Sequence, residues 1–431
     1  MPRIGLWWEV ERPECAWLSR LAAVRPDPSM RLSFILLGFF LLALVLLDAF
    51  QTIILPRRPV GRFRITRLFF LLTWYPWTVL VGLSPSRRMR EQMLSIYGPL
   101  ALLLLFVVWA SLLTLAYGFI YFGLGVSLVD PHHALTGLQH LRSCLYFSGT
   151  TIFTLGMGDV QPTSEIARTL TVIEAGTGFG FFALVVGYVP VLYTAFSNRE
   201  VSVALLDGRA GSPPTAGELL MRHNFAGGHT ALTTLLAEWE RWSATMLETH
   251  ISYPILCYYR SQHDNQSWLA AVTTILDTCA LLITTIEGPS TRQAQLTFAV
   301  ARHTLVDLGH VFQLEEMEKR CRESEPIRLY DDEFAQLCSL LGEAGFSLCG
   351  DRESRNRLAA IRKLYEPHAH ALADYLRLEL PRWAPPAGPH KPDNWETVAK
   401  LRTPAAFADR ISSHVSPRSG ASLLSDEEWH R

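Results

Sequence analysis

The stretch from Thr154 to Asp159 reads Thr-Leu-Gly-Met-Gly-Asp, and its main chain could bind a cation. Its two glycines can adopt backbone conformations that other residues resist, so successive carbonyl oxygens can face the same way. A ladder of carbonyl oxygens can replace the water shell of a bare cation. The sequence therefore predicts a cation path formed by the main chain of Thr154, Leu155, Gly156, Met157 and Gly158.

Two long apolar runs, residues 97–122 and 166–196, flank this stretch, and each is long enough to cross the hydrocarbon of a membrane. Residues 138–153, just before the glycines, suffice for a short helix that descends into the membrane. The C-terminal end of such a helix carries a partial negative charge that favours a cation. Non-helical backbone at membrane depth is tolerated only where it is buried or lines a water-filled path, so this order of elements indicates a pore.

The residues around the glycines extend this pattern. Tyr146, Phe147, Ser148 and Thr151 precede them, and Pro162, Arg168 and Gly178 follow. The segment resembles the pore loop of tetrameric and two-pore-domain potassium channels, including bacterial members with a two-helix pore domain, whose filter reads Thr-Val-Gly-Tyr-Gly-Asp. The resemblance implies an outer helix, a pore helix, a selectivity filter at 154–158 and an inner helix, within a pore domain at 97–199.

The resemblance also implies the roles of single residues. Carbonyl oxygens of the filter would bind permeating K⁺, the Thr154 hydroxyl would add an inner ligand, and Asp159 would lie at the outer mouth and concentrate cations. Two residues depart from the family, because Met157 replaces the usual aromatic residue and Phe153 stands where a second threonine is common. A flexible thioether packs less definitely than a ring, so potassium selectivity depends on how Met157 supports the filter.

The number of filter segments sets the expected assembly. The chain contains one, and one segment supplies one wall of a four-sided cage, so geometry predicts a homotetramer. The expected partners are other copies of the chain, the lipid bilayer and monovalent cations. No nucleic acid and no cofactor are expected, and no metal beyond the permeating cation, since the seven cysteines show no CxxC spacing.

The inner helix contains Gly176, Gly178 and Gly180, which lack the strand-turn-helix context of a nucleotide-binding loop. Gly178 occupies the position of the family's inner-helix hinge, and Pro190 is expected to kink the helix by removing a backbone donor. Close helix packing is an equally good explanation of the glycines. Glu174 is either a buried acid with hydrogen-bond partners, which we favour, or an ion ligand.

Residues 34–96 precede the pore domain and begin with an apolar run, 34–55, that can span the membrane. Its acid, Asp48, either has a function within the span or reaches the nearby interface. Residues 68–83 form a second, shorter apolar element with arginines on both sides. Because positive residues favour the cytoplasmic side, we expect an interfacial or re-entrant helix there, with a short spanning helix as the alternative. Residues 1–33 are expected to be interfacial or disordered.

The rest of the chain is predicted to be a helical cytoplasmic domain at 200–403, followed by a disordered tail at 404–431. Residues 267–286 are apolar but contain Asp277, which favours a buried core helix over a further span. The polar residues of 253–268 indicate a network between helices or a ligand site. His303, Asp307 and His310 share one helix face and could hold a metal, although structural roles are commoner for such residues.

The 431 residues, 49% of them hydrophobic, suit a protein that is part membrane and part soluble. No catalytic motif is present, so we expect no enzyme. The sequence favours an all-α, multi-pass protein of the cell membrane that conducts cations, K⁺ in particular, with a cytoplasmic regulatory or assembly domain. The alternative is a membrane-anchored helical signalling or interaction protein whose pore is degenerate or non-selective.

Overall fold

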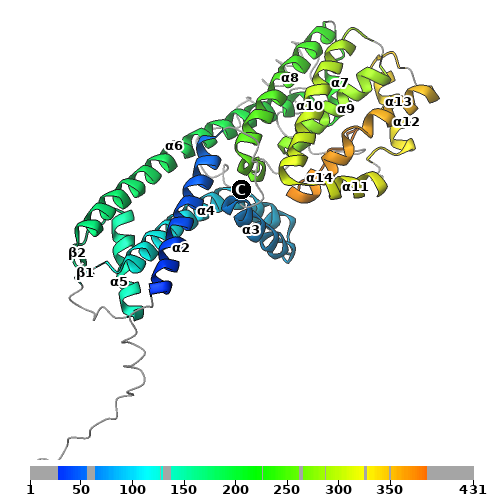
Figure 1. Cartoon of the computed structure of the whole chain (residues 1–431). Coiled ribbons are helices and arrows are strands. Elements are labelled where there is room, and N and C mark those ends of the chain that lie inside the picture. Colours follow the sequence, from blue (N-terminus) through cyan, green and yellow to red (C-terminus); the bar gives the residue numbers. More distant parts are fainter. Residues whose placement is uncertain are drawn as a thin grey trace, which may run out of the picture. The chain divides into compact units, whose positions relative to one another are not determined.

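The computed structural model describes residues 28–55, 64–126, 128–129, 137–225, 227–261, 266–286, 288–324, 328–348 and 351–385. The predicted all-α class is confirmed, since the described elements are helices apart from β1 (Leu128–Val129) and β2 (Gln161–Pro162), which pair antiparallel (Figure 1). Most of the N-terminal segment predicted at 1–33, residues 386–403 and the tail at 404–431 lie outside the described residues. The chain divides into two compact units, Met1–Tyr193 and Thr194–Arg431.

Four described helices are long and apolar enough to cross a membrane. They are α2 (Pro28–Ala49), which continues as the π-helical turn η1 (Phe50–Ile54), and α3 (Ile65–Gly82), α4 (Arg87–Leu124) and α6 (Glu165–Ala210). Helices α2, α4 and α6 extend beyond the apolar runs that predicted them. The reason is local, because flanking residues such as Arg, Met, Glu and Gln are good helix formers although they are too polar for the hydrocarbon.

Helices α2 and α4 pack closely through glycines. A Cβ atom added to Gly38 would lie 2.7 Å from the Ala116 carbonyl oxygen, and one added to Gly123 would lie 2.7 Å from the Arg31 carbonyl oxygen. Small residues let backbones approach in this way within a membrane. Because residue 38 lies beside 116 and residue 123 beside 31, the two helices run in opposite directions.

Asp48 joins three helices inside the first unit. Its carboxylate accepts hydrogen bonds from the Thr66 amide at 3.0 Å and the Trp109 indole at 2.9 Å, and Arg64 Nε lies 3.6 Å away. Asp48 is 3% exposed, so it is buried against these partners. Asp48 thus connects α2 to α4 and to the first turn of α3.

Helix α3 forms a hairpin with the beginning of α4. The Thr73 and Tyr97 hydroxyls lie 2.9 Å apart, and the Trp77 indole donates to the Met93 carbonyl at 3.2 Å. The ring of Trp74 packs on that of Tyr97 with 4.7 Å between centroids. Helix α3 therefore starts beside Asp48 and runs along α4 toward its N-terminus, where a short turn at residues 83–86 connects the two.

The second unit is helical throughout its described length. After residues 194–210 of α6 come α7 (Ala216–Arg222), α8 (Gly228–Ser252), the 3₁₀ turn η2 (Pro254–Tyr258), α9 (Trp268–Thr284), α10 (Thr291–Phe312), α11 (Glu315–Ser324), α12 (Asp331–Glu343), α13 (Arg352–Arg362) and α14 (Glu366–Leu376). Helix α9 is buried along nearly all of its length, as predicted for a core helix. It packs against α10 and α13, and α10 packs against α8.

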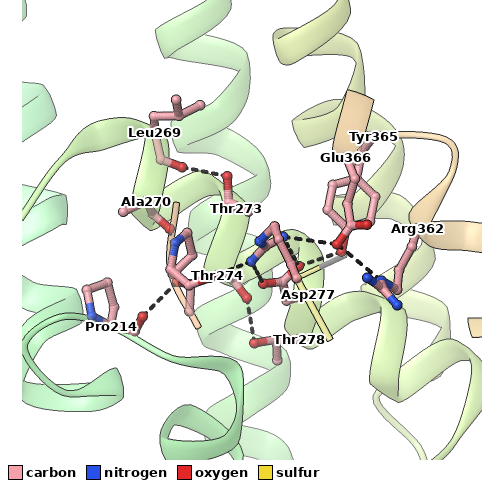
Figure 2. Close-up of polar contacts among 12 residues, drawn as sticks. Pro214, Leu269, Ala270, Thr273, Thr274, Asp277, Thr278, Arg362, Tyr365 and Glu366 are labelled. Carbon is pink, nitrogen blue, oxygen red and sulfur yellow. Dashed lines mark hydrogen bonds and ion pairs between the residues drawn. The ribbon is translucent and has the colours of Figure 1, made fainter. Parts of the chain in front are cut away.

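A buried ion network lies at the centre of this unit (Figure 2). Arg328 binds both carboxylate oxygens of Asp277, at 2.6 and 3.2 Å, and Glu366 at 3.2 Å. The Tyr365 hydroxyl also donates to Asp277. Burial opposes the charge of Arg328, but Asp277, Tyr365 and Glu366 together outweigh it and raise the arginine pKa. The network fastens α9 to α14 and to the segment around Arg328.

A second buried contact holds residues 194–210 of α6. Arg199 donates to the carbonyl oxygens of Leu256 and Tyr259, each at 2.8 Å, and its Nη1 lies 3.2 Å from His250 Nε2. His250 Nδ1 lies 3.0 Å from the Met246 carbonyl, so Nδ1 carries the proton and Nε2 accepts from Arg199. Burial, and then the charge of Arg199, hold the pKa of His250 well below its usual value.

Breaking the ion network should destabilise the second unit. In the Asp277→Asn variant Arg328 stays buried with half of its charge partners removed, and such losses typically cost about 3 kcal/mol. The free energy of unfolding, or the melting temperature of the full-length protein in detergent, measures the effect. The exposed Glu323→Gln change is the control, and equal stability of the two variants would contradict a structural role for the network.

Acid should weaken the Arg199–His250 contact. The folded pKa of His250 lies below the 6.5 of an unperturbed histidine, so its contribution is complete above that pH. It is lost as the pH falls further, because only the unfolded chain then binds the proton. The melting temperature should drop less between about pH 7 and 5 in His250→Asn than in the wild type or in the exposed control His229→Asn. Identical pH profiles would refute this assignment.

Candidate ion-conduction site

The pore helix is α5 (Gly137–Ile152), close to the predicted 138–153. Its last turn closes directly onto the glycine-rich stretch, since the Thr150 carbonyl accepts from the amides of Leu155 at 2.8 Å and Gly156 at 3.3 Å. The carbonyl oxygens at the end of a helix need such partners. The C-terminal end of α5 is thus fixed to the beginning of the predicted filter.

The backbone of the predicted filter alternates in handedness. Thr154, Gly156 and Gly158 have φ values of +55°, +55° and +76°, whereas Leu155 and Met157 between them do not have positive φ. A conformation that reverses at every second residue can bring successive peptide groups to one side of the chain, as a carbonyl ladder requires. Two of the three left-handed positions are glycines, the residue that adopts them without strain.

The side chains of this stretch point away from the rest of the chain. Leu155 is 64% exposed and Met157 is 66% exposed. A Cβ atom added to either Gly156 or Gly158 would meet no atom within 4 Å. Within the part of the chain that the structure describes, this stretch is therefore open around its two glycines.

Two side chains form hydrogen bonds with the Gly158–Asp159 end of the predicted filter. The Tyr146 hydroxyl of α5 donates to Asp159 at 2.8 Å, and the Gln161 amide donates to the Gly158 carbonyl at 2.9 Å. Gln161 is itself in β2, which pairs with β1. The sequence had identified Tyr146 only as part of a motif and had given Gln161 no role, since neither contact follows from a local pattern.

Glu174 joins the three helices α4, α5 and α6. Its carboxylate accepts from the Tyr121 hydroxyl of α4 at 2.6 Å and from the Ser148 hydroxyl of α5 at 2.5 Å, and its side chain is fully buried. One turn further along α6, the Thr177 and Tyr117 hydroxyls lie 2.8 Å apart. Glu174 is therefore a buried acid with hydrogen-bond partners, and α6 holds it beside the pore helix.

The inner-helix glycines differ in their surroundings. A Cβ atom added to Gly178 would lie 2.3 Å from the Ile152 carbonyl oxygen, at the end of α5, whereas one added to Gly176 or Gly180 would meet nothing within 4 Å. Gly178 is therefore required for close packing of α6 on the pore helix. Pro190 lies inside α6, which continues beyond it to Ala210.

The other candidate residues are in the second unit. Among the described residues, no group of three or more His, Cys, Asp or Glu could hold a metal. Asp307 lies 3.3 Å from His303 and 3.9 Å from His310, and both histidines are exposed. In the segment 253–268, Arg260 donates to the carbonyl oxygens of Leu376 and Arg377 at 2.7 Å, while residues 262–265 lie outside the described ones.

Comparison with known proteins agrees with this geometry. Residues 104–194, which contain most of α4, all of α5, the filter stretch and the membrane part of α6, match the family model described as "Ion channel". The chain carries an ion channel domain. This family is a non-enzyme class, in agreement with the lack of catalytic motifs in the sequence.

A distant relative is also a membrane protein. The uncharacterized membrane protein YdjJ of Bacillus subtilis (strain 168) is 29% identical over 192 residues, which are 43% of this chain and 52% of that protein. The chain thus spans about half the length of the curated relative it matches. No solved structure matches the chain.

The close approach at Gly178 can be tested within the ion channel domain. Gly178→Ala places a methyl group against the Ile152 carbonyl, and overpacking of this kind typically costs roughly 1–3 kcal/mol. The melting temperature in detergent should fall, whereas the matched change Gly180→Ala should leave it unchanged or raise it. Equal melting temperatures for the two variants would show that α6 does not pack on α5 at this residue.

Proposed function

We propose that the chain is one subunit of a homotetrameric, potassium-conducting channel whose filter is formed by residues 154–158. The observation that carries the proposal is the alternation of positive φ at Thr154, Gly156 and Gly158, directly after the pore helix and inside the ion channel domain. Main-chain carbonyls that face one side can replace the hydration shell of K⁺. The Thr154 hydroxyl would add the innermost ligand and Asp159 would form the outer acidic ring.

The tetramer is supported by two surfaces that the described residues of a single chain leave exposed. The filter stretch is open around its two glycines, as described above. Helix α6 also exposes apolar side chains, and those more than half exposed include Val172, Phe179, Phe182, Val186 and Tyr193. Their spacings of three, four and seven residues are those of a helix seam. In a tetramer these side chains would be covered by neighbouring inner helices or would line the inner cavity.

The helix contacts support one membrane orientation. Helices α2 and α4 run in opposite directions, and α4 and α6 do so as well, because Tyr121 contacts Glu174 while Phe106 contacts Tyr188. The start of α3, the start of α4 and the part of α6 around Tyr188 then lie on one side, opposite the filter. Arginines gather on that side, which favours the cytoplasm. We place the second unit there and the N-terminal end of α2 outside.

In this proposal the contacts behind the filter set its selectivity. Glu174 holds the pore helix against its two neighbours, and Tyr146 holds Asp159. Met157 would pack between subunits, where it has no hydroxyl to donate. Gly178 acts as a packing residue, and bending of α6 near Pro190 is the more accessible way to open the inner mouth. We assign the second unit a regulatory or assembly role, because it holds residues 194–210 of the inner helix through Arg199.

Flux measurements test the filter directly. The purified protein in liposomes should pass K⁺, and Gly156→Val should abolish the flux, because a β-branched residue does not adopt φ near +55°. The matched control Leu155→Val changes the neighbouring residue, whose φ is not positive, and should keep most of the flux. Undiminished flux in Gly156→Val would rule out this filter.

Selectivity is measured by the reversal potential in mixed K⁺ and Na⁺. A value near the potassium equilibrium potential supports the proposal, and a value near zero identifies a non-selective cation channel. Absence of any conductance, in protein that binds a partner through the second unit, would favour the membrane-anchored signalling protein.

A further inference from the structure

Helix α3 presents an apolar face that no other described residue covers. Five side chains at helical spacing lie on it, each more than half exposed: Leu68, Leu72, Tyr75, Val79 and Leu83. The other face is used, since Thr73, Trp74 and Trp77 pack on α4. A continuous apolar helix face of this length is rarely left in water.

The contacts of α3 show how it lies relative to the spanning helices. Its first turn is fixed beside Asp48, near the end of α2, by the Thr66 amide and hydroxyl. Its last turn is followed at once by Arg87, the first residue of α4. Since α4 crosses in the direction opposite to α2, both ends of α3 are on the side where α2 ends. Helix α3 therefore does not cross the bilayer, although its length and composition would allow it.

Basic residues lie at the tip of this hairpin. Arg88 and Arg90 are exposed in the first turn of α4, and Arg87 precedes them. The acid in this turn is Glu91, which is half-buried and has an interaction of its own. Positive charge is therefore in excess next to a helix whose outer face is apolar. A hydrocarbon-facing surface bordered by arginines is complementary to a leaflet of anionic phospholipids.

We infer that the hairpin of α3 and the first turns of α4 is a binding surface for anionic phospholipids of the cytoplasmic leaflet. The apolar face of α3 lies among acyl chains, in continuity with the lipid-facing sides of α2 and α4, and Arg88 and Arg90 bind phosphate groups. Helix α3 is then a half-inserted interfacial helix. The inference rests on the membrane orientation given under the proposed function and is independent of ion conduction.

Lipid-dependent stability tests the charge part of this inference. The full-length protein in detergent is titrated with dioleoylphosphatidylglycerol, and its melting temperature is followed. Phosphatidylglycerol should raise the melting temperature, and the concentration for half of the effect should increase at least about tenfold in Arg88→Gln/Arg90→Gln. The matched double variant Lys319→Gln/Arg320→Gln, in α11 of the second unit, removes two exposed charges elsewhere and should behave like the wild type.

The lipid controls decide the source of the effect. Phosphatidylcholine and soluble glycerol phosphate should each shift the melting temperature much less, because the first lacks net charge and the second lacks acyl chains. An equal response to phosphatidylcholine, or an unchanged response of the Arg88→Gln/Arg90→Gln variant, would overturn the inference. None of these results depends on flux, so a failure here is distinguishable from a failure of the filter assignment.

Photocrosslinking tests the apolar face itself. Benzoylphenylalanine introduced at position 72 of the full-length chain in phosphatidylglycerol-containing liposomes should crosslink to lipid, as detected by mass spectrometry. The same amino acid at Leu269, which is fully buried in α9, is the control and should not reach lipid. Crosslinks from position 72 to a second copy of the chain would show that a protein interface covers α3, and would overturn the lipid assignment.

Discussion

The structure depends on one constraint. The backbone between the end of α5 at residue 152 and the start of α6 at residue 165 is not helical, so its carbonyl groups lack the hydrogen bonds of a helix. In hydrocarbon such groups have no solvent partner, so protein or permeating ions must satisfy them. The chain meets this demand on three sides: the pore helix closes onto the stretch through Thr150, Gln161 binds its outer end, and Tyr146 fixes the acid that follows. The remaining side is open, and it is there that the proposed function places the ion path.

The polar contacts inside the first unit follow a common logic. Asp48 and Glu174 would each be costly in a bilayer, and each is buried with hydrogen-bond donors from other helices. An acid placed in this way fixes how the helices rotate relative to one another, because apolar packing alone permits several rotations. Asp48 does this beside the start of α3, and Glu174 does it beside the pore helix.

Some of this architecture could be predicted from the sequence and some could not. Hydropathy located the four described helices that are long and apolar enough to cross a membrane, and the Thr-Leu-Gly-Met-Gly-Asp stretch located the ion channel domain that the family comparison then matched. Helix ends were missed, because α6 continues to Ala210 after its apolar residues stop. The partners of Glu174 are 26 and 53 residues away along the chain, and no local pattern encodes such pairs. The same holds for Arg328 and Asp277, which are 51 residues apart along the chain.

Gly178 carries a consequence for any movement of the inner helix. It lies against the last carbonyl of the pore helix, so the residue at the position that the family resemblance assigns to a hinge also makes the packing contact between α6 and α5. Bending α6 at this residue would also break its packing contact with the end of the pore helix. Opening of the inner end and loosening of the filter would then occur together. A bend near Pro190 would keep the contact between Gly178 and the pore helix, so the inner end could open without loosening the filter.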